Sequence, residues 1–220
     1  MPFLNTIINK ILDIVFPVIC VGCRKTGANF CIKCISNSPF ALRECDEWIF
    51  PLFDYRHPPV KKALWLLKYK NKRGVAEEFA KILYGKMMEE LSDMTTMESF
   101  HDSIIIPIPL SKSRYRERGY NQVELICKQL VKLDNNVNFI LENNVLVKPK
   151  DTEHQARIKN RKERLKNIIG SFSTKNENLV KNKNIILIDD ILTTGATLTE
   201  ARKVLKKAGA KKIIAFTVAH

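Results

Sequence analysis

Apolar residues recur every three or four positions over residues 60–91, in two stripes that are separated by Gly74. This spacing places the apolar side chains on one face of a helix, so we predict two consecutive helices here. The following apolar run, residues 103–110, is short and rich in β-branched residues, and Pro107 and Pro109 interrupt it. It is typical of a buried strand that passes into a loop at its carboxyl end.

The C-terminal part of the chain contains two apolar runs with a helical stripe between them. The runs, residues 184–188 and 213–219, are of the buried-strand type, and the stripe between them ends at Gly209. A unit of this kind, about 35 residues long, requires parallel strands joined by a crossover helix. Another helical stripe, residues 123–130, has Cys127 on its apolar side, so we assign this cysteine to the core rather than to a reactive thiol.

The N-terminal residues form a different kind of sequence. Residues 1–45 hold five of the six cysteines but little hydrophobic periodicity beyond the opening segment. A segment this small needs a cross-link, such as a structural metal ion or disulfides, to fold. We therefore predict a separate module over residues 1–45, followed by an α/β domain over residues 46–220.

Four of these cysteines form two Cys-x-x-Cys pairs, Cys20 with Cys23 and Cys31 with Cys34. Four thiolates on two tight turns can close a tetrahedral Zn²⁺ site of the structural kind, so we predict a zinc-ribbon-like module. Disulfide or redox chemistry stays an alternative, although a thioredoxin-like pair begins a helix in a βαβ context that this segment lacks. The role of Cys45, as a remnant, a fifth ligand or a substitute ligand, is left open.

The chain is strongly basic, with 37 Lys and Arg against 23 Asp and Glu and a formal net charge of +14. This balance favours nucleic acid, phosphorylated ligands or an anionic surface as partners, with a solvated basic face as the plain alternative. No apolar run approaches the roughly 18 to 20 residues that span a bilayer. Residues 11–19 follow Lys10 as in a short signal peptide, but Asp13 and Pro17 interrupt them, so we predict a cytoplasmic protein without a membrane span.

Two acids and a loop of small, hydroxylated residues adjoin in the strand-to-helix segment 184–201. Asp189 and Asp190 close the predicted strand, where they suit the 2′ and 3′ hydroxyls of a ribose and can stabilise positive charge at C1′. The loop lets backbone N–H groups and the helix N-terminus converge on a phosphate. A strand end with a simple Thr197-x-x-Glu200 capping box would explain the helix start but not the other loop residues. The predicted phosphate cradle comprises Thr193, Thr194, Gly195, Ala196 and Thr197.

This segment resembles the phosphoribosyl-pyrophosphate motif of type I phosphoribosyltransferases, in which four hydrophobic residues and two acids precede two variable residues, Thr-Thr-Gly and a final Thr. The resemblance implies a parallel sheet with helices on both faces. It also implies phosphoribosyl pyrophosphate and Mg²⁺ as ligands, with Asp189 and Asp190 as the catalytic pair. After the strand predicted at residues 103–110, Arg114, Arg116 and Arg118 are suited to neutralise a pyrophosphate group, and we assign Arg114 and Arg118 to the ligand site.

The chain is similar almost end to end to the ComF family of competence-associated proteins. The cysteine pairs, the Lys68-Tyr69-Lys70 run and the Arg-x-x-x-Arg-Gly-aromatic-Asn-Gln pattern of residues 114–122 carry this resemblance. The resemblance implies a zinc module and a role in bringing single-stranded DNA into the cytoplasm during natural transformation. Other DNA-uptake proteins are then further candidate partners.

Two functions are compatible with these patterns. The first is a DNA-uptake factor that binds phosphoribosyl pyrophosphate and single-stranded DNA, and here we predict that Arg161 and Arg164, in a segment similar to the family's mobile loop, contact the DNA. The alternative is a phosphoribosyltransferase that acts on a nucleobase or an amine, in salvage or in amide transfer. The sequence has no hood segment with an obvious base-specific pattern that would name the acceptor, and it leaves the oligomeric state open.

Overall fold

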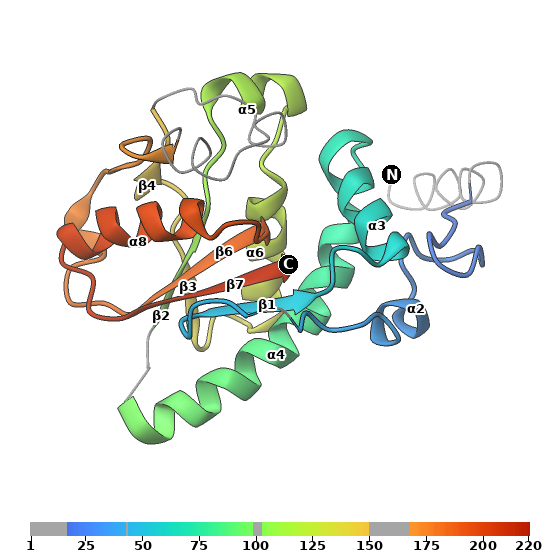
Figure 1. The fold of residues 1–220 in the computed structure, drawn as a ribbon, viewed down its shortest axis with the longest axis horizontal. Helices are drawn as coiled ribbons and strands as arrows, with labels where there is room; N and C mark the ends of the chain where they lie inside the picture. The colour runs from blue at the N-terminus through green and yellow to red at the C-terminus, as the bar shows by residue number, and fades with distance from the viewer. Residues whose placement is uncertain (1–16, 43, 99–102, 150–167) are drawn as a thin grey trace, which may run out of the picture.

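A sheet of parallel strands forms the centre of the protein (Figure 1). The structure, a computed structural model, describes residues 17–42, 44–98, 103–149 and 168–220. The strands of this sheet are β1 (Ile49–Phe53), β2 (Ser103–Pro107), β3 (Phe139–Leu141), β6 (Ile185–Ile191) and β7 (Ile213–Ala219). They lie in the order β1-β7-β6-β2-β3, and each neighbouring pair is parallel.

Helices cover both faces of this sheet. They are α3 (Pro58–Tyr69), α4 (Gly74–Glu98) and α6 (Gln122–Leu133) on one face and α8 (Ala196–Lys207) on the other. Ile186 and Ile188 of β6 point to the first group, whereas Ile185 and Leu187 point to α8, because a pleated strand directs successive side chains to opposite faces. Within the described ranges, no helix combines the length and the apolar character needed to cross a bilayer.

The elements expected from hydrophobic spacing are present. The predicted strand-helix-strand unit is β6, α8 and β7, and its two strands pair in parallel along their whole length. The two helices predicted over residues 60–91 are α3 and α4, and the stripe at 123–130 lies in α6, where Cys127 is fully buried. The strand predicted at 103–110 ends at Pro107.

Shorter elements connect this framework. They are α2 (Ile32–Ser36) before the sheet, α5 (Lys112–Arg118) after β2, the two-stranded pair of β4 (Leu146–Val147) with β5 (Ser173–Thr174), and the 3-10 helix η1 (Glu177–Leu179). Of these, α5 bears on function because it carries the predicted arginines into the region beyond the end of β2.

The N-terminal segment shares a core with the α/β domain. Cys20, Phe30 and Ile35 are buried in the same apolar cluster as the inner face of α4. The ring of Phe30 packs edge-on against Phe79 of α4, with centroids 6.0 Å apart and an angle of 82° between the ring planes. The predicted module therefore rests directly on α4, and its boundary after residue 45 stays a prediction.

Candidate functional site

A cavity of about 690 Å³ opens at the carboxyl edge of the sheet, where β2 and β6 end side by side. Loops that follow neighbouring parallel strands meet at this edge, which is the usual ligand position in open α/β sheets. Helix α3 forms another wall, and Figure 1 shows it beyond the arrowheads of β6 and β7. Of the predicted site residues, the cavity is lined by Arg114, Arg118, Asp189, Asp190, Thr193 and Thr197.

Asp190 is buried at the end of β6, and side chains from two helices hold its carboxylate. Lys68 Nζ of α3 lies 2.9 Å from Oδ1, and Gln122 Nε2 of α6 donates a hydrogen bond to Oδ2. Burial raises the pKa of Asp190, but the charge of Lys68 and the hydrogen bonds from Lys68 and Gln122 outweigh it, so the net pKa is lowered. The carboxylate is charged at neutral pH and can accept further donors, because it offers about four acceptor positions.

Asp189 differs from its neighbour in environment. Its side chain is partly exposed, and Oδ1 accepts a hydrogen bond from the backbone N–H of Asp190 at 2.8 Å. Burial, followed by the negative charge of Asp190, raises the pKa of Asp189 to about 7. The pair therefore combines one carboxylate that stays charged with one that exchanges a proton near neutral pH.

The two predicted arginines occupy different positions in the cavity wall. Arg118 Nη1 donates to Gln122 Oε1 at 2.9 Å, and its guanidinium lies 5.1 Å from the ring centroid of Tyr69. Arg114 has a buried nitrogen, Nη2, that lacks a hydrogen-bond partner among the described residues. Burial, and then the nearby charge of Arg118, lower the pKa of Arg114. An anion in the cavity would relieve both the unmet donor and the repulsion between the two cations.

Residues 119–121, between Arg118 and α6, have structural roles. Gly119 ends α5 with a φ of 74°, a left-handed conformation that favours glycine. Asn121 caps α6 by accepting from the N–H of Val123, and it donates to the carbonyl of Ile108. Tyr120 donates through its hydroxyl to the Leu67 carbonyl in α3. These hydrogen bonds fix the loop after β2 to α3 and to the start of α6.

The predicted phosphate loop leads directly into α8. Gly195 is the N-cap residue with a φ of 74°, which a residue with a side chain rarely adopts. Thr193 is exposed, Thr197 is partly exposed and Ala196 is buried, while Thr194 accepts from the N–H of Ala196 at 3.4 Å. These positions leave the Thr193 and Thr197 side chains facing the cavity.

The capping-box alternative for this helix is not formed. The N-cap of α8 has no side-chain hydrogen bond, and the Glu200 carboxylate instead accepts from the N–H of Gly170 at 2.8 Å. Glu200 is buried and ties α8 to the segment before β5. The loop composition is thus not explained by a simple helix start.

The predicted DNA contacts Arg161 and Arg164 lie outside the described residues, so their role stays a prediction. Lys68 and Gln122, in contrast, belong to the site although the sequence did not assign them to it. They stand in the Lys68-Tyr69-Lys70 run and in the arginine pattern, but no local spacing links either of them to Asp190.

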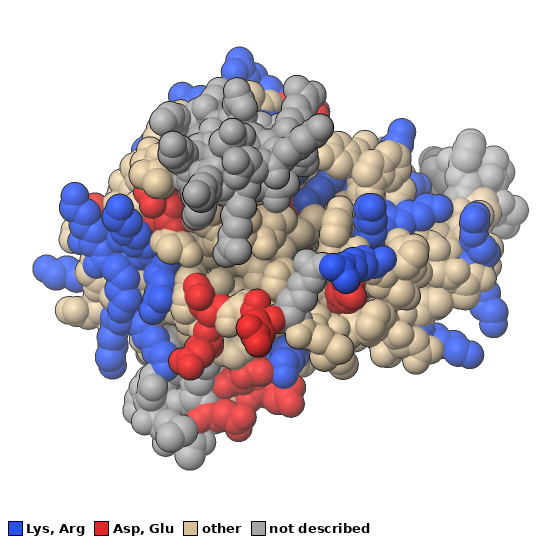
Figure 2. Space-filling view, in the orientation of Figure 1, with Lys and Arg blue, Asp and Glu red and all other residues tan. Residues whose placement is uncertain are grey.

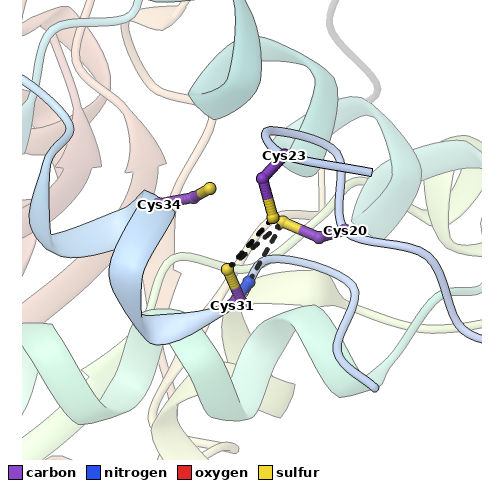
Figure 3. A group of neighbouring side chains, drawn as sticks. All are labelled: Cys20, Cys23, Cys31 and Cys34. Carbon is purple, nitrogen blue, oxygen red and sulfur yellow. Dashed lines mark hydrogen bonds between the residues drawn. The ribbon is translucent and has the colours of Figure 1, made fainter. Parts of the chain in front are cut away.

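The four predicted cysteine ligands gather at one point (Figure 3). Cys20 and Cys23 come from one loop, while Cys31 and Cys34 come from the start of α2, and all four Sγ atoms lie within 4.8 Å of one another. Cys31 Sγ is 3.6 Å from Cys20 Sγ and 3.7 Å from Cys23 Sγ. Zn–S bonds of about 2.3 Å in a tetrahedron give sulfur separations of roughly 3.8 Å, so the cluster fits a zinc module.

The backbone around this cluster is adapted to thiolates. The N–H groups of Gly22 and Cys31 both point at Cys20 Sγ, at 3.4 and 3.3 Å. Burial raises the pKa of Cys20, but these backbone hydrogen bonds outweigh it and lower the pKa to about 6. A Cβ atom on Gly22 would lie 2.8 Å from Cys34 Sγ, so only glycine fits this turn.

Cys45 is not part of the metal cluster. The cluster of possible ligands found among the described residues consists of Cys20, Cys23, Cys31 and Cys34. Cys45 Sγ instead donates to the carbonyl of Ile49 at 3.2 Å. Burial, and then the charge of Asp46, raise the pKa of Cys45, so this thiol is the protonated form at neutral pH.

Comparison with known proteins gives a domain match, curated relatives and solved structures. Residues 128–220 match the phosphoribosyl transferase domain family. Competence protein F of Haemophilus influenzae is 28% identical over 207 residues, which cover 89% of this chain and 87% of that protein. Competence protein ComFC of Bacillus subtilis is 40% identical over 116 residues, 52% of this chain and 43% of that protein. A solved hypoxanthine phosphoribosyltransferase from Staphylococcus aureus is 14% identical, with a TM-score of 0.34 over 64% of this chain and 62% of that chain.

The parallel sheet, the acid pair before a Thr-Thr-Gly loop and the domain match define an α/β domain of the phosphoribosyltransferase type. The cysteine cluster lies in the N-terminal part, before this domain match, and the similarity to competence protein F covers 89% of the chain. These similarities support membership of the chain in the ComF family.

We expect Lys68→Met to destabilise the protein by about 3 to 5 kcal/mol, because it leaves a buried carboxylate without its cation. The depressed folded-state pKa of Asp190 makes this stabilisation fully present above the unfolded pKa of about 3.9, and it is lost as pH falls through the folded value. The difference in unfolding free energy between Lys68→Met and the unmutated protein should therefore be smaller at pH 3 than at pH 7. Urea unfolding at pH 7 and at pH 3 measures both effects.

Lys81→Met is the matched control for this variant. Lys81 pairs with Glu77 on the surface of α4, where both side chains are about half exposed, and such pairs contribute about 0 to 1 kcal/mol. If the two variants lost equal stability at pH 7, Lys68 would not be the compensating charge of Asp190.

We expect Gly22→Ala to lower the amount of metal bound per chain, because the added methyl group displaces Cys34 Sγ. Elemental analysis after gel filtration measures the ratio of metal to protein. Gly85→Ala is the control, since a Cβ at Gly85 in α4 has no neighbour within 4 Å. An unchanged metal ratio in Gly22→Ala would show that the turn tolerates the methyl group.

Proposed function

We propose that the protein binds phosphoribosyl pyrophosphate with Mg²⁺ at the carboxyl edge of its sheet and acts in DNA uptake during natural transformation, in the cytoplasm. The observation that carries this proposal is the meeting of three groups in one cavity. An acid pair, two threonines of the loop before α8 and an arginine with an unmet buried donor all line it. A ribose flanked by a phosphate and a pyrophosphate needs these three kinds of group.

Each part of the ligand has a matching set of residues. The loop from Thr193 to Thr197 would hold the 5-phosphate at the start of α8, and Asp189 with Asp190 would accept the ribose hydroxyls. Arg114 and Arg118 would face the pyrophosphate, whose remaining charge Mg²⁺ neutralises. The acid pair argues for a sugar beside the phosphate loop, because two carboxylates repel a bare phosphate.

The link to DNA rests on other observations. The relatives are named competence proteins, and the net charge of +14 favours a polyanionic partner. We propose single-stranded DNA as that partner, with Arg161 and Arg164 among its contacts and with other DNA-uptake proteins acting beside it. For the cysteine cluster we propose structural Zn²⁺, which would add its binding free energy to the folding of the N-terminal segment.

A phosphoribosyltransferase reaction on a nucleobase or an amine is the second candidate. It is favoured by the extent of the cavity, which continues past the acid pair to Trp65 and Tyr69 of α3 and so has room for a flat acceptor. Pyrophosphate release from phosphoribosyl pyrophosphate, assayed over a panel of bases and amines with and without single-stranded DNA, separates the two functions. Turnover of one base without DNA would favour the enzyme.

We expect phosphoribosyl pyrophosphate with Mg²⁺ to bind in calorimetric titration, and Asp189→Asn together with Asp190→Asn to weaken it. Each charged hydrogen bond lost costs about 1.5 to 3 kcal/mol. Asp93→Asn together with Glu89→Gln, at exposed positions on α4, makes the same change of net charge and is the control. Absence of heat with the unmutated, folded protein would reject the site.

The titration of Asp189 should make the affinity for phosphoribosyl pyrophosphate depend on pH. With a pKa raised to about 7 by burial and by Asp190, Asp189 gains its charge between pH 6 and pH 8. A charged carboxylate accepts hydroxyl donors better, so we expect affinity to rise over this range. The rise should be smaller in Asp189→Asn, and the difference between the two proteins removes the contribution from ligand phosphates. If affinity rose equally with pH in the unmutated protein and in Asp189→Asn, the proposed role of Asp189 would be contradicted.

A further inference from the structure

Helix α3 presents an aromatic face to the cavity. Its inner face is buried through Val60, Leu64 and Leu67, but Trp65 is 46% exposed and Tyr69 is 44% exposed. Both rings line the cavity that also contains the acid pair. They stand one helical turn apart, with centroids separated by 6.2 Å and ring planes inclined by 46°.

The surroundings of these rings are cationic. Helix α3 has no acidic residue, and basic side chains precede and follow the rings along the chain. Two cations lie over the rings themselves, Lys70 at 5.4 Å from the centroid of Trp65 and Arg118 at 5.1 Å from that of Tyr69. The cavity lining adds Lys61 and Lys62 from the first turns of the helix.

We propose that this face of α3 is a docking surface for single-stranded nucleic acid. Bases would stack on Trp65 and Tyr69, while the phosphates would lie against Lys61, Lys62 and Lys70. Aromatic rings set in a basic groove are the usual means of holding single strands without sequence preference. The inference rests on the proposed function and deepens it, because it places the strand beside the phosphoribosyl site.

Charge and shape together separate this face from other basic surfaces of the molecule. Figure 2 shows Lys and Arg side chains gathered over the end of α8 as well as over α3. The α8 group includes Lys203, Lys206 and Lys207, but the cavity with exposed rings lies at α3. A purely electrostatic surface attracts any polyanion, whereas exposed rings beside cations favour an unpaired, unstacked strand.

The same helix connects this surface with the sugar site. Lys68 contacts Asp190, and the carbonyl of Leu67 accepts from Tyr120, so α3 is held directly against the groups that line the phosphoribosyl cavity. A strand on the outer turns of α3 would therefore present a base close to the acid pair. Bound phosphoribosyl pyrophosphate is then expected to change the affinity for the strand.

Trp65 itself supplies the test, because the chain has two tryptophans and Trp48→Phe leaves Trp65 as the single one. We expect oligothymidylate to quench the fluorescence of this variant at low salt. In the otherwise unmutated protein, Trp65→Ala should weaken oligothymidylate binding about 5- to 150-fold, the equivalent of one stacked base. Lys61→Ala with Lys62→Ala should reduce the slope of log affinity against log salt by about 1.4, two contacts at roughly 0.7 each.

Lys206→Ala with Lys207→Ala makes the same change of charge on α8 and serves as the control. Oligothymidylate binding that leaves Trp65 unquenched, or that falls equally in both lysine pairs, would overturn the proposal. Quenching by a free nucleobase together with no binding of the strand would overturn it too and would indicate an acceptor pocket. Calorimetry with phosphoribosyl pyrophosphate on Trp65→Ala keeps the two proposals apart, since that variant should still bind the sugar.

Discussion

The buried charge of Asp190 is the constraint on which the arrangement of the site depends. A carboxylate out of water is stable only with a cation and hydrogen-bond donors around it. Lys68 and Gln122 supply these from α3 and α6, and Arg118 is attached to the same set through Gln122. The requirement brings helices from distant parts of the chain to the end of one strand, and the cavity is the space that they enclose with it.

The charges of the two aspartates are stabilised unequally by their surroundings, and the chemistry of the acid pair follows from this difference. Asp190 forms an ion pair with Lys68 and accepts a hydrogen bond from Gln122. Asp189 accepts a backbone N–H and is repelled by its neighbour, and the lysines near it act only through their charge. Two chemically identical side chains thereby differ in proton affinity. One can remain a fixed acceptor while the other exchanges a proton, a division of roles that suits either regulated binding of a sugar phosphate or transfer of the ribosyl group.

Local patterns in the sequence predicted much of this structure. The unit of β6, α8 and β7 has a strong hydrophobic period, and the acid pair and the cysteine quartet are recognisable by spacing alone. The contact of Lys68 with Asp190 joins residues 122 positions apart, so no local pattern encodes it. Glu200 shows the converse case: its spacing is that of a capping box, the alternative that the other loop residues disfavour, but its buried carboxylate accepts from the N–H of Gly170. The steric need for glycine at position 22 likewise arises only when the chain folds and brings the Cys34 side chain against the turn between Cys20 and Cys23.

The edge-on packing of Phe30 against Phe79 has a consequence for how such proteins can diversify. Because the two rings share one core, neither the N-terminal segment nor α4 can be exchanged for that of a relative without matching the other surface. Recombination at the boundary between them would leave a cavity or a clash in most chimaeras. Substitutions in the N-terminal segment are therefore expected to require matching substitutions in α4, unlike those in a zinc module that folds by itself.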